Sequence, residues 1–167
     1  MKNLELKVSI NNFIDIISRL KKIGAKFSGT LNQKDVYYKV NSGRLKTREI
    51  NNKDFELIFY RRANTKKSKF SDYHILKFSK SELKILATIL NNVFEGKSVV
   101  EKKRQPWLYK HTRVHLDKVK GLGNFLELET VIKNISFAKA TKEHKEVIKL
   151  LNLNKYKKQS KSYCDLL

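Results

Sequence analysis

The sequence predicts an α+β protein built as a closed antiparallel β-barrel with helices packed on its outside. Several segments alternate apolar and polar residues, as strands with two distinct faces do, and three others space their apolar residues at helical intervals. No internal repeat of solenoid or propeller length interrupts this pattern. Many antiparallel strands with few helices favour a closed or nearly closed barrel, because closure removes exposed strand edges.

The strand predictions rest on alternation and on turn residues. Residues 1–10 place Leu4, Leu6 and Val8 on one face, with polar residues between them. Residues 51–54 have the composition of a hairpin turn, and residues 121–123 form a second turn with two glycines. Further strands are predicted at residues 36–40, 44–50, 55–62, 71–78, 99–104, 107–119 and 124–132.

Helices are predicted at residues 13–24, 79–92 and 136–151. Asn11 and Asn12 offer an N-cap to the first helix, and Gly24 ends it. Ser79 is a candidate cap for the second helix, and Glu82 stands at the capping-box position three residues later. Residues 63–70 are polar and rich in lysine, which predicts a loop.

Length and composition indicate one soluble globular domain. The chain has 167 residues, no apolar run of the roughly 20 residues that a bilayer requires, and one cysteine, Cys164. These features predict a cytoplasmic location without disulfides or membrane attachment. The formal net charge is +21, which three explanations fit: nucleic-acid binding, a site for a small polyanion, or lysine-rich composition of the source genome.

The placement of charges within the strands separates these explanations. Charged residues recur at every second position, so each row lies on one face of its strand. An ordinary antiparallel sheet would turn such a face to water. If the rows face inward instead, cations and carboxylates line the lumen, where they would hold phosphate oxygens and a hard metal ion. The rows are Glu5 and Lys7; Lys46 and Arg48; Lys102 and Arg104; Arg113, His115 and Asp117; and Glu127 and Glu129.

These motifs, in this order, resemble the CYTH family, which includes class IV adenylyl cyclases and thiamine triphosphatases. Residues 3–7, Asn-Leu-Glu-Leu-Lys, are similar to the E-x-E-x-K signature of the family, and residues 101–104 to its E-K-x-R strand. The strongest match runs from His115 to Glu129, with an aspartate, a Gly-Leu-Gly turn and paired glutamates, as in class IV cyclases. The ending, residues 161–167, also resembles the family.

The resemblance implies a triphosphate tunnel formed by a single CYTH domain over residues 1–167. It implies catalytic roles for Lys7, Arg48, Arg104 and Asp117. The residues implied to contact the triphosphate are Lys7, Lys46, Arg48, Arg61, Lys102, Arg104, Arg113 and Lys161. The residues implied to bind Mg²⁺ or Mn²⁺ are Glu5, Asp117, Glu127 and Glu129.

Asn3 departs from the pattern, because the family has a glutamate there. An uncharged amide oxygen predicts a weaker or shifted second metal position, unless Asn3 only caps the strand. His115 would either hydrogen-bond within the lumen or assist proton transfer. Glu101, on the opposite face from Lys102, is predicted to be a surface charge. Walker, G-x-G-x-x-G and G-x-S-x-G motifs are absent from the sequence.

The resemblance favours a class IV adenylyl cyclase-like enzyme, a phosphorus–oxygen lyase that converts ATP to cyclic AMP and pyrophosphate. One alternative is a triphosphatase that hydrolyses inorganic triphosphate or thiamine triphosphate. The non-enzymatic alternative is an RNA- or polyphosphate-binding module. The expected partner is a nucleoside triphosphate or another triphosphate, with neither a membrane nor nucleic acid as a partner, and a homodimer is compatible with the family.

Overall fold

The computed structural model describes residues 2–62 and 68–167. Within these ranges the helices are α1 (Ile14–Lys22), α2 (Lys80–Val93) and α3 (Phe137–Leu150). The long strands are β1 (Lys2–Ser9), β3 (Leu31–Tyr38), β4 (Arg44–Ile50), β5 (Asp54–Arg62), β6 (Lys69–Phe78), β7 (Gly96–Tyr109), β8 (Thr112–Val119) and β9 (Gly123–Val131). Two short strands, β2 (Lys26–Phe27) and β10 (Lys157–Lys158), pair with β7 and β1.

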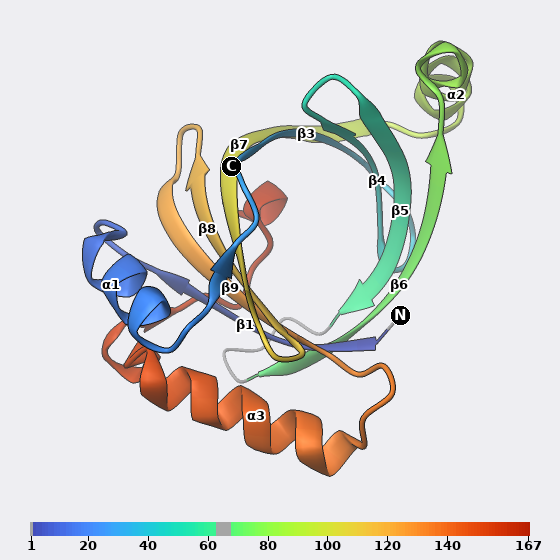
Figure 1. The fold of residues 1–167 in the computed structure, drawn as a ribbon. Coiled ribbons are helices and arrows are strands. Elements are labelled where there is room, and N and C mark those ends of the chain that lie inside the picture. The colour runs from blue at the N-terminus through green and yellow to red at the C-terminus, as the bar shows by residue number, and fades with distance from the viewer. Residues whose placement is uncertain (1, 63–67) are drawn as a thin grey trace.

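The long strands close into the antiparallel barrel that the sequence predicts. Their order is β1-β6-β5-β4-β3-β7-β8-β9, and β9 returns to pair with β1. Figure 1 looks into the barrel and shows the helices outside its wall. In the closing ladder Glu5 lies opposite Glu129, and Lys7 lies opposite Glu127. Closure therefore brings the first strand of the chain beside the paired glutamates.

The main hydrophobic core lies outside the barrel, between its wall and the helices α1 and α3. Ile16 and Leu20 of α1 and Val147 of α3 are fully buried there. They pack with outward-facing residues of β1, β8 and β9, such as Leu6 and Leu128. Because these strands give their apolar face to the core, their alternate residues, which carry the charges, face the lumen. Helix α2 lies apart at the far side of the barrel in Figure 1.

The C-terminal segment returns to the lumen. A short 3₁₀ helix, Tyr163–Asp165, buries Tyr163 and Cys164 against Tyr37, Val100 and Phe125. Arg44 Nη2 pairs with Asp165 Oδ2 at 2.9 Å and ties this segment to β4. The last residues of the chain thus supply part of the lumen wall.

The local signals of the sequence are confirmed at the β4–β5 turn and at the cap of α2. Asn51 and Asn52 both adopt positive φ between β4 and β5, the geometry that a tight hairpin requires. Ser79 and Glu82 form the predicted capping box of α2. The predicted asparagine N-cap of α1 is wrong, because Phe13 occupies the N-cap position and makes no side-chain cap hydrogen bond; Asn12 Oδ1, one residue earlier, accepts from the backbone N–H of Ile14.

Two predicted strand boundaries are wrong. The strand expected at residues 36–40 is β3, which begins at Leu31, because Gln33 and Asp35 continue its inward row. The single strand expected at residues 107–119 is the end of β7 and the whole of β8, with a turn at Lys110 and His111 where Lys110 adopts positive φ. The expected loop at residues 63–70 falls mostly on residues 63–67, outside the described residues; β6 already begins at Lys69.

No helix in the described ranges combines the length and the apolar composition needed to cross a bilayer.

Candidate functional site

The barrel encloses a polar cavity of about 230 Å³. Its lining comes from strands all around the barrel and from the C-terminal segment. Six cationic side chains that the sequence assigned to triphosphate binding line it: Lys7, Lys46, Arg48, Lys102, Arg104 and Arg113. The carboxylates Glu5, Glu127 and Glu129 line it as well. The charged rows therefore face inward.

On one wall three cations surround the buried carboxylate of Asp35. Arg48 donates two hydrogen bonds to it, at 2.7 and 2.8 Å, and Lys46 donates one at 2.8 Å. Lys102 Nζ lies 3.5 Å from Asp35 Oδ2. Burial alone would raise the pKa of Asp35, but the charges of Arg48, Lys46 and Lys102 hold this pKa well below its usual value. Asp35 is thus an anion that fixes the positions of three cations.

The lysines on this wall have weakened proton affinity. Burial, followed by the neighbouring Arg48, lowers the pKa of Lys46 to about 7, although Asp35 opposes the shift. Burial lowers the pKa of Lys102 to about 8. An incoming polyanion would raise both pKa values by stabilising the charged lysines.

On the adjoining wall, formed by β7, β8 and β9, Arg104 connects two carboxylates. It makes two parallel hydrogen bonds to Asp117, at 2.7 and 2.6 Å, and a short one to Glu127 Oε2. Asp117 is fully buried and also accepts a hydrogen bond from the Tyr163 hydroxyl at 2.9 Å. Lys7 Nζ lies 3.0 Å from Glu127 Oε1 and 3.6 Å from the centre of the Tyr163 ring. Both oxygens of Asp117 are therefore engaged by side chains of the protein.

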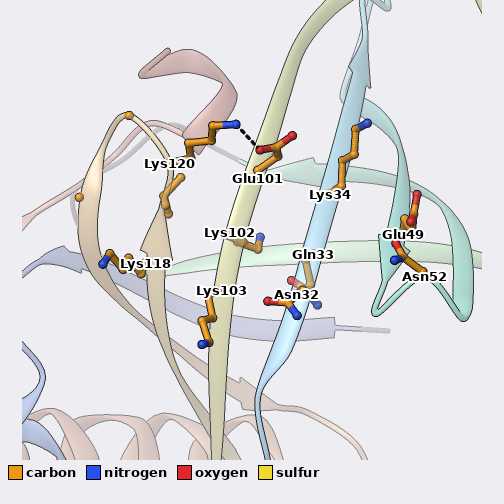
Figure 2. A pocket seen from close by; sticks show the side chains of 13 residues that line it. Asn32, Gln33, Lys34, Glu49, Asn52, Glu101, Lys102, Lys103, Lys118 and Lys120 are labelled. Carbon is orange, nitrogen blue, oxygen red and sulfur yellow. Dashed lines mark hydrogen bonds and ion pairs between the residues drawn. The ribbon is translucent and has the colours of Figure 1, made fainter.

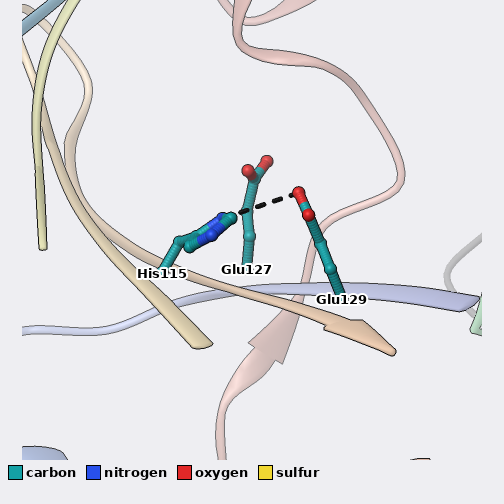
Figure 3. A group of neighbouring side chains, drawn as sticks. All are labelled: His115, Glu127 and Glu129. Carbon is teal, nitrogen blue, oxygen red and sulfur yellow. Dashed lines mark ion pairs between the residues drawn. The ribbon is translucent and has the colours of Figure 1, made fainter. Parts of the chain in front are cut away.

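A potential metal-binding cluster lies beside this wall. His115, Glu127 and Glu129 each offer a ligand atom, and these atoms lie within 4.8 Å of one another (Figure 3). Glu129 Oε2 pairs with Arg113 at 2.9 Å, and Glu129 Oε1 lies 3.5 Å from His115 Nδ1. Burial, then the charge of Arg104, lowers the pKa of His115, which favours the neutral imidazole that a metal ion requires.

This donor set fits a divalent metal ion. It combines two carboxylates with a buried imidazole whose Nδ1 makes no hydrogen bond in the structure. The cluster includes His115 in place of Asp117, which the resemblance had implied as a ligand. The metal-binding role of Asp117 stays a prediction that its pairing with Arg104 does not favour.

Glu5 and Asn3 lie on β1 at the edge of this cluster. Glu5 lines the cavity, and its Oε1 accepts a hydrogen bond from the Tyr73 hydroxyl at 2.6 Å. With the Asn3 amide oriented to satisfy both of its groups, its oxygen accepts from Arg113 Nη2 at 3.2 Å. Asn3 therefore contacts a cation of the lumen, and its link to a second metal position stays a prediction.

Two predicted contacts lie away from the cavity. Arg61 is exposed on the outer face of β5, with its guanidinium over the Phe59 ring, because the adjacent Tyr60 faces inward. The side chain of Lys161 is exposed, and only its backbone carbonyl reaches the lumen, where it accepts from Lys7 Nζ at 3.4 Å. Glu101 pairs on the surface with Lys120, as predicted.

Three functional candidates were not predicted: Asp35, Tyr73 and Tyr163. Asp35 continues an inward row with Gln33 and Tyr37, so alternation could have revealed it if the strand had been extended toward the N-terminus. The tyrosines contact residues far away in sequence, with Tyr73 reaching Glu5 and Tyr163 reaching Asp117. Sequence spacing carries no signal for these two contacts.

A larger pocket of about 760 Å³ lies on the outside of β3, β7 and β8 (Figure 2). Exposed lysines at positions 34, 103, 118 and 120 border it, and Lys120 pairs with Glu101 at 2.7 Å. Exposed ion pairs of this kind are screened by solvent and contribute little to the stability of the fold. The inner cavity is the candidate site because its charges are buried and paired with one another.

Comparison with known proteins agrees with this geometry. The model of the CYTH domain matches residues 1–163. The chain belongs to the CYTH family. The triphosphate-tunnel arrangement implied by the sequence motifs is therefore the fold of this chain, and the inward-facing cations and carboxylates lie in the tunnel.

Individual relatives span nearly the whole chain. A candidate adenylate cyclase of Methanocaldococcus jannaschii is 29% identical, with 99% of this chain and 98% of that protein covered. A solved structure from Pyrococcus horikoshii has a TM-score of 0.83 at 24% identity and covers 99% of both chains. A Hippeastrum protein, described as a candidate adenylyl cyclase with a dominant triphosphatase activity, has a TM-score of 0.70 at 9% identity and covers 99% of this chain and 93% of its own. The two structures bear on the fold alone.

Proposed function

We propose that this protein is a class IV adenylyl cyclase-like enzyme that converts ATP to cyclic AMP and pyrophosphate with Mg²⁺ or Mn²⁺. The observation that carries the proposal is the lumen itself, in which cations from several strands converge on one small cavity beside a carboxylate cluster. Phosphoryl chemistry requires mainly positioning and charge stabilisation, and this arrangement can supply both without a covalent nucleophile.

The size of the cavity supports a triphosphate group as its occupant. At about 230 Å³ the cavity is smaller than the roughly 300–1,000 Å³ of sites that enclose drug-sized ligands. The triphosphate would lie in the lumen, with the nucleoside extending toward a mouth of the tunnel. Arg48 and Arg104 would hold phosphate oxygens through their planar guanidinium groups, with Lys7, Lys46 and Lys102 as point charges.

In the proposed reaction the ribose 3′-oxygen attacks the α-phosphorus, the 3′-hydroxyl releases its proton to water, and the bond from the α-phosphorus to the oxygen that bridges it to the β-phosphorus breaks. A divalent ion held by Glu127 and Glu129 would neutralise charge on phosphate oxygens. The residues of the chain hold the phosphates in line and stabilise the pyrophosphate that leaves. The likeness over nearly the whole length to a candidate adenylate cyclase supports this reaction.

A triphosphatase is the second candidate. In that case water attacks the terminal phosphorus, and a diphosphate and orthophosphate are released from the same lumen. The support is the activity described for the Hippeastrum protein, whose fold this chain shares. Inorganic triphosphate and thiamine triphosphate are the substrates that would occupy the lumen without need of a site for adenine.

The test is to incubate the purified protein with ATP, inorganic triphosphate or thiamine triphosphate, each with Mg²⁺ and with Mn²⁺, and to separate the products. Cyclic AMP with pyrophosphate is the expected result, and orthophosphate without cyclic AMP would assign the triphosphatase. Glu127→Gln should abolish turnover, while Glu101→Gln, which changes an exposed carboxylate, serves as the matched control.

The non-enzymatic alternative predicts different behaviour. An RNA- or polyphosphate-binding module would follow the overall charge of +21, bind with a steep salt dependence and tolerate Glu127→Gln. Absence of turnover with every substrate, together with salt-dependent RNA binding, would favour that alternative.

A further inference from the structure

We propose that His115 is a third metal ligand, together with Glu127 and Glu129, and that it makes this site bind Mn²⁺ more tightly than Mg²⁺. The inference rests on the metal requirement of the proposed function and goes beyond it, because it names a nitrogen ligand and the selectivity that this ligand confers. The carboxylates alone would not distinguish the two ions in this way.

The first support is the position of the ring. His115 lies on β8, two residues from Arg113 on one side and two from Asp117 on the other, on the inward face of the strand. Only 7% of its surface is exposed. Opposite it in the ladder stands Glu127, and Glu129 is two residues further along β9. The register of two adjacent strands thus fixes all three side chains on the same wall, and Figure 3 shows them converging.

The second support is the unsatisfied nitrogen. His115 Nδ1 is buried and makes no hydrogen bond, although buried polar atoms almost always have a partner. It points toward Glu129, whose Oε1 lies 3.5 Å away, too far for a good hydrogen bond. Two ligand atoms on one ion with bonds of about 2.1 Å lie roughly 3 Å apart. A bound ion would therefore satisfy this nitrogen after only a small movement.

The glutamates remain able to bind an ion while paired with cations. Lys7 and Arg104 contact Glu127, and Arg113 contacts Glu129. An ionised carboxylate has about four acceptor positions, so these contacts do not exhaust it. A triphosphate in the lumen would also attract the same cations and leave the glutamates to the metal.

The chemistry of the ligand set gives the selectivity. Mg²⁺ is a hard ion that prefers oxygen ligands and near-ideal octahedral geometry. Imidazole nitrogen suits transition metals, and Mn²⁺, although it shares with Mg²⁺ a preference for carboxylate and phosphate oxygen, is a transition metal with less strict geometry and tolerates one imidazole better than Mg²⁺ does. Two oxygen donors with one imidazole therefore favour Mn²⁺ over Mg²⁺.

The test measures metal binding by the full chain without nucleotide, so its result does not depend on any enzymatic activity. Mn²⁺ is titrated and its free fraction followed by electron paramagnetic resonance, with Mg²⁺ as competitor. Pulsed measurements on bound Mn²⁺ then report coupling to a directly bound ¹⁴N. We expect this coupling in the wild type and a Mn²⁺ affinity at least about tenfold above that for Mg²⁺.

Variants assign the nitrogen. His115→Asn places an amide near the position of Nδ1, so it should abolish the ¹⁴N coupling, weaken Mn²⁺ binding about tenfold and change Mg²⁺ binding much less. Glu129→Gln should weaken both ions. His74→Gln, which changes an exposed histidine on β6, is the control and should leave the spectrum intact.

Wild-type protein that binds Mn²⁺ without ¹⁴N coupling, or His115→Asn protein with unchanged Mn²⁺ affinity, would overturn the proposal. Wild-type spectra do not depend on whether a variant folds. If the protein shows the coupling but makes no cyclic AMP, the ligand assignment stands and the proposed reaction fails. If it makes cyclic AMP but shows no coupling, the reaction stands and the ligand assignment fails.

Discussion

Arg104 binds Asp117 through two parallel hydrogen bonds, from Nε to Oδ1 at 2.7 Å and from Nη2 to Oδ2 at 2.6 Å. The two residues are also direct partners in the β7–β8 ladder, so the backbone register fixes the pair. Asp117 orients the guanidinium along the lumen wall toward Glu127 on β9. The pair thus ties a phosphate-binding candidate to the carboxylate cluster.

The first prediction concerns Arg104→Lys. A lysine keeps the charge but cannot make the two parallel bonds and reach Glu127 as well. We expect kcat to fall by about 10²-fold, because the variant loses an oriented hydrogen-bond donor to the charge that develops on the phosphate oxygens. Turnover of ATP and of inorganic triphosphate is the measurement. Arg19→Lys, on the partly exposed surface of α1, is the matched control and should retain activity.

The lysine variant is preferred to alanine for a structural reason. Arg104→Ala would leave the buried Asp117 without its cation, and removing one partner of a buried pair costs about 3–5 kcal/mol of stability. A loss of activity in the Arg104→Ala variant would then be hard to separate from a loss of folded protein. Unchanged turnover in Arg104→Lys would contradict the role given to this guanidinium.

The second prediction concerns Asp35→Asn. Removing this charge leaves Lys46, Arg48 and Lys102 to repel one another in a buried site, and we expect a loss of about 3–5 kcal/mol in the free energy of unfolding. Inorganic triphosphate should restore much of this loss, because it supplies the missing negative charge. Thermal unfolding with and without triphosphate is the measurement, and the ligand-induced rise in Tm should be larger in Asp35→Asn than in the wild type.

Glu49→Gln provides the control for this experiment, because it changes a carboxylate that borders the outer pocket. Its Tm and its response to triphosphate should match the wild type. Equal ligand-induced shifts in Asp35→Asn and the wild type would mean that Asp35 does not balance the cations of the lumen.

The third prediction concerns protons taken up when triphosphate binds. The pKa of Lys46 is about 7 in the free protein, so at pH 8 this lysine is mostly neutral. A bound polyanion raises that pKa and draws a proton from solution, approaching about one proton at Lys46. Calorimetric titration at pH 8 in buffers of different ionisation enthalpy measures this uptake. Lys46→Arg, which stays charged throughout, should reduce the uptake.

Much of the fold follows from local sequence signals, since alternation and capping are short-range properties. The Asn51-Asn52 turn and the Ser79–Glu82 capping box were both identified from a few residues. Strand limits were less certain, because Gln33 and Asp35 are polar residues in a buried row and resemble loop residues in the sequence alone. A single-residue offset also separates Arg61, which faces outward, from Tyr60, which lines the tunnel.

The candidate site was predictable where it depends on strand alternation and not where it depends on closure. Lys46 and Arg48 share a face by simple periodicity. The contact of Tyr163 with Asp117 instead joins residues 46 positions apart, after the chain has passed around α3. His115 joins Glu127 and Glu129 in the potential metal-binding cluster because of the directions of their side chains, which the spacing of residues in the sequence does not reveal.

The fourth prediction concerns acid sensitivity outside the tunnel. His144 of α3 is almost fully buried, with Nδ1 against Thr130 Oγ1 at 2.9 Å and Nε2 against Ser68 Oγ at 3.0 Å. Burial lowers its pKa from 6.5 to about 4, against the opposing charge of Glu143. The unfolded chain therefore binds a proton at this histidine before the folded chain does, and the stability it contributes above pH 6.5 is lost as the pH falls toward 4.

The size of this effect follows from the shift, which corresponds to about 3 kcal/mol between pH 6.5 and pH 4. Urea unfolding at pH 7, 5.5 and 4.5 measures it. His144→Gln can keep hydrogen bonds to Thr130 and Ser68 but cannot titrate, so its stability should depend less on pH over this interval than that of the wild type. His74→Gln, an exposed change, should follow the wild type. The same pH dependence in His144→Gln and the wild type would mean that His144 does not cause the acid sensitivity over this interval, and the lumen carboxylate Asp35 would not explain it either, because its lowered pKa keeps it ionised there.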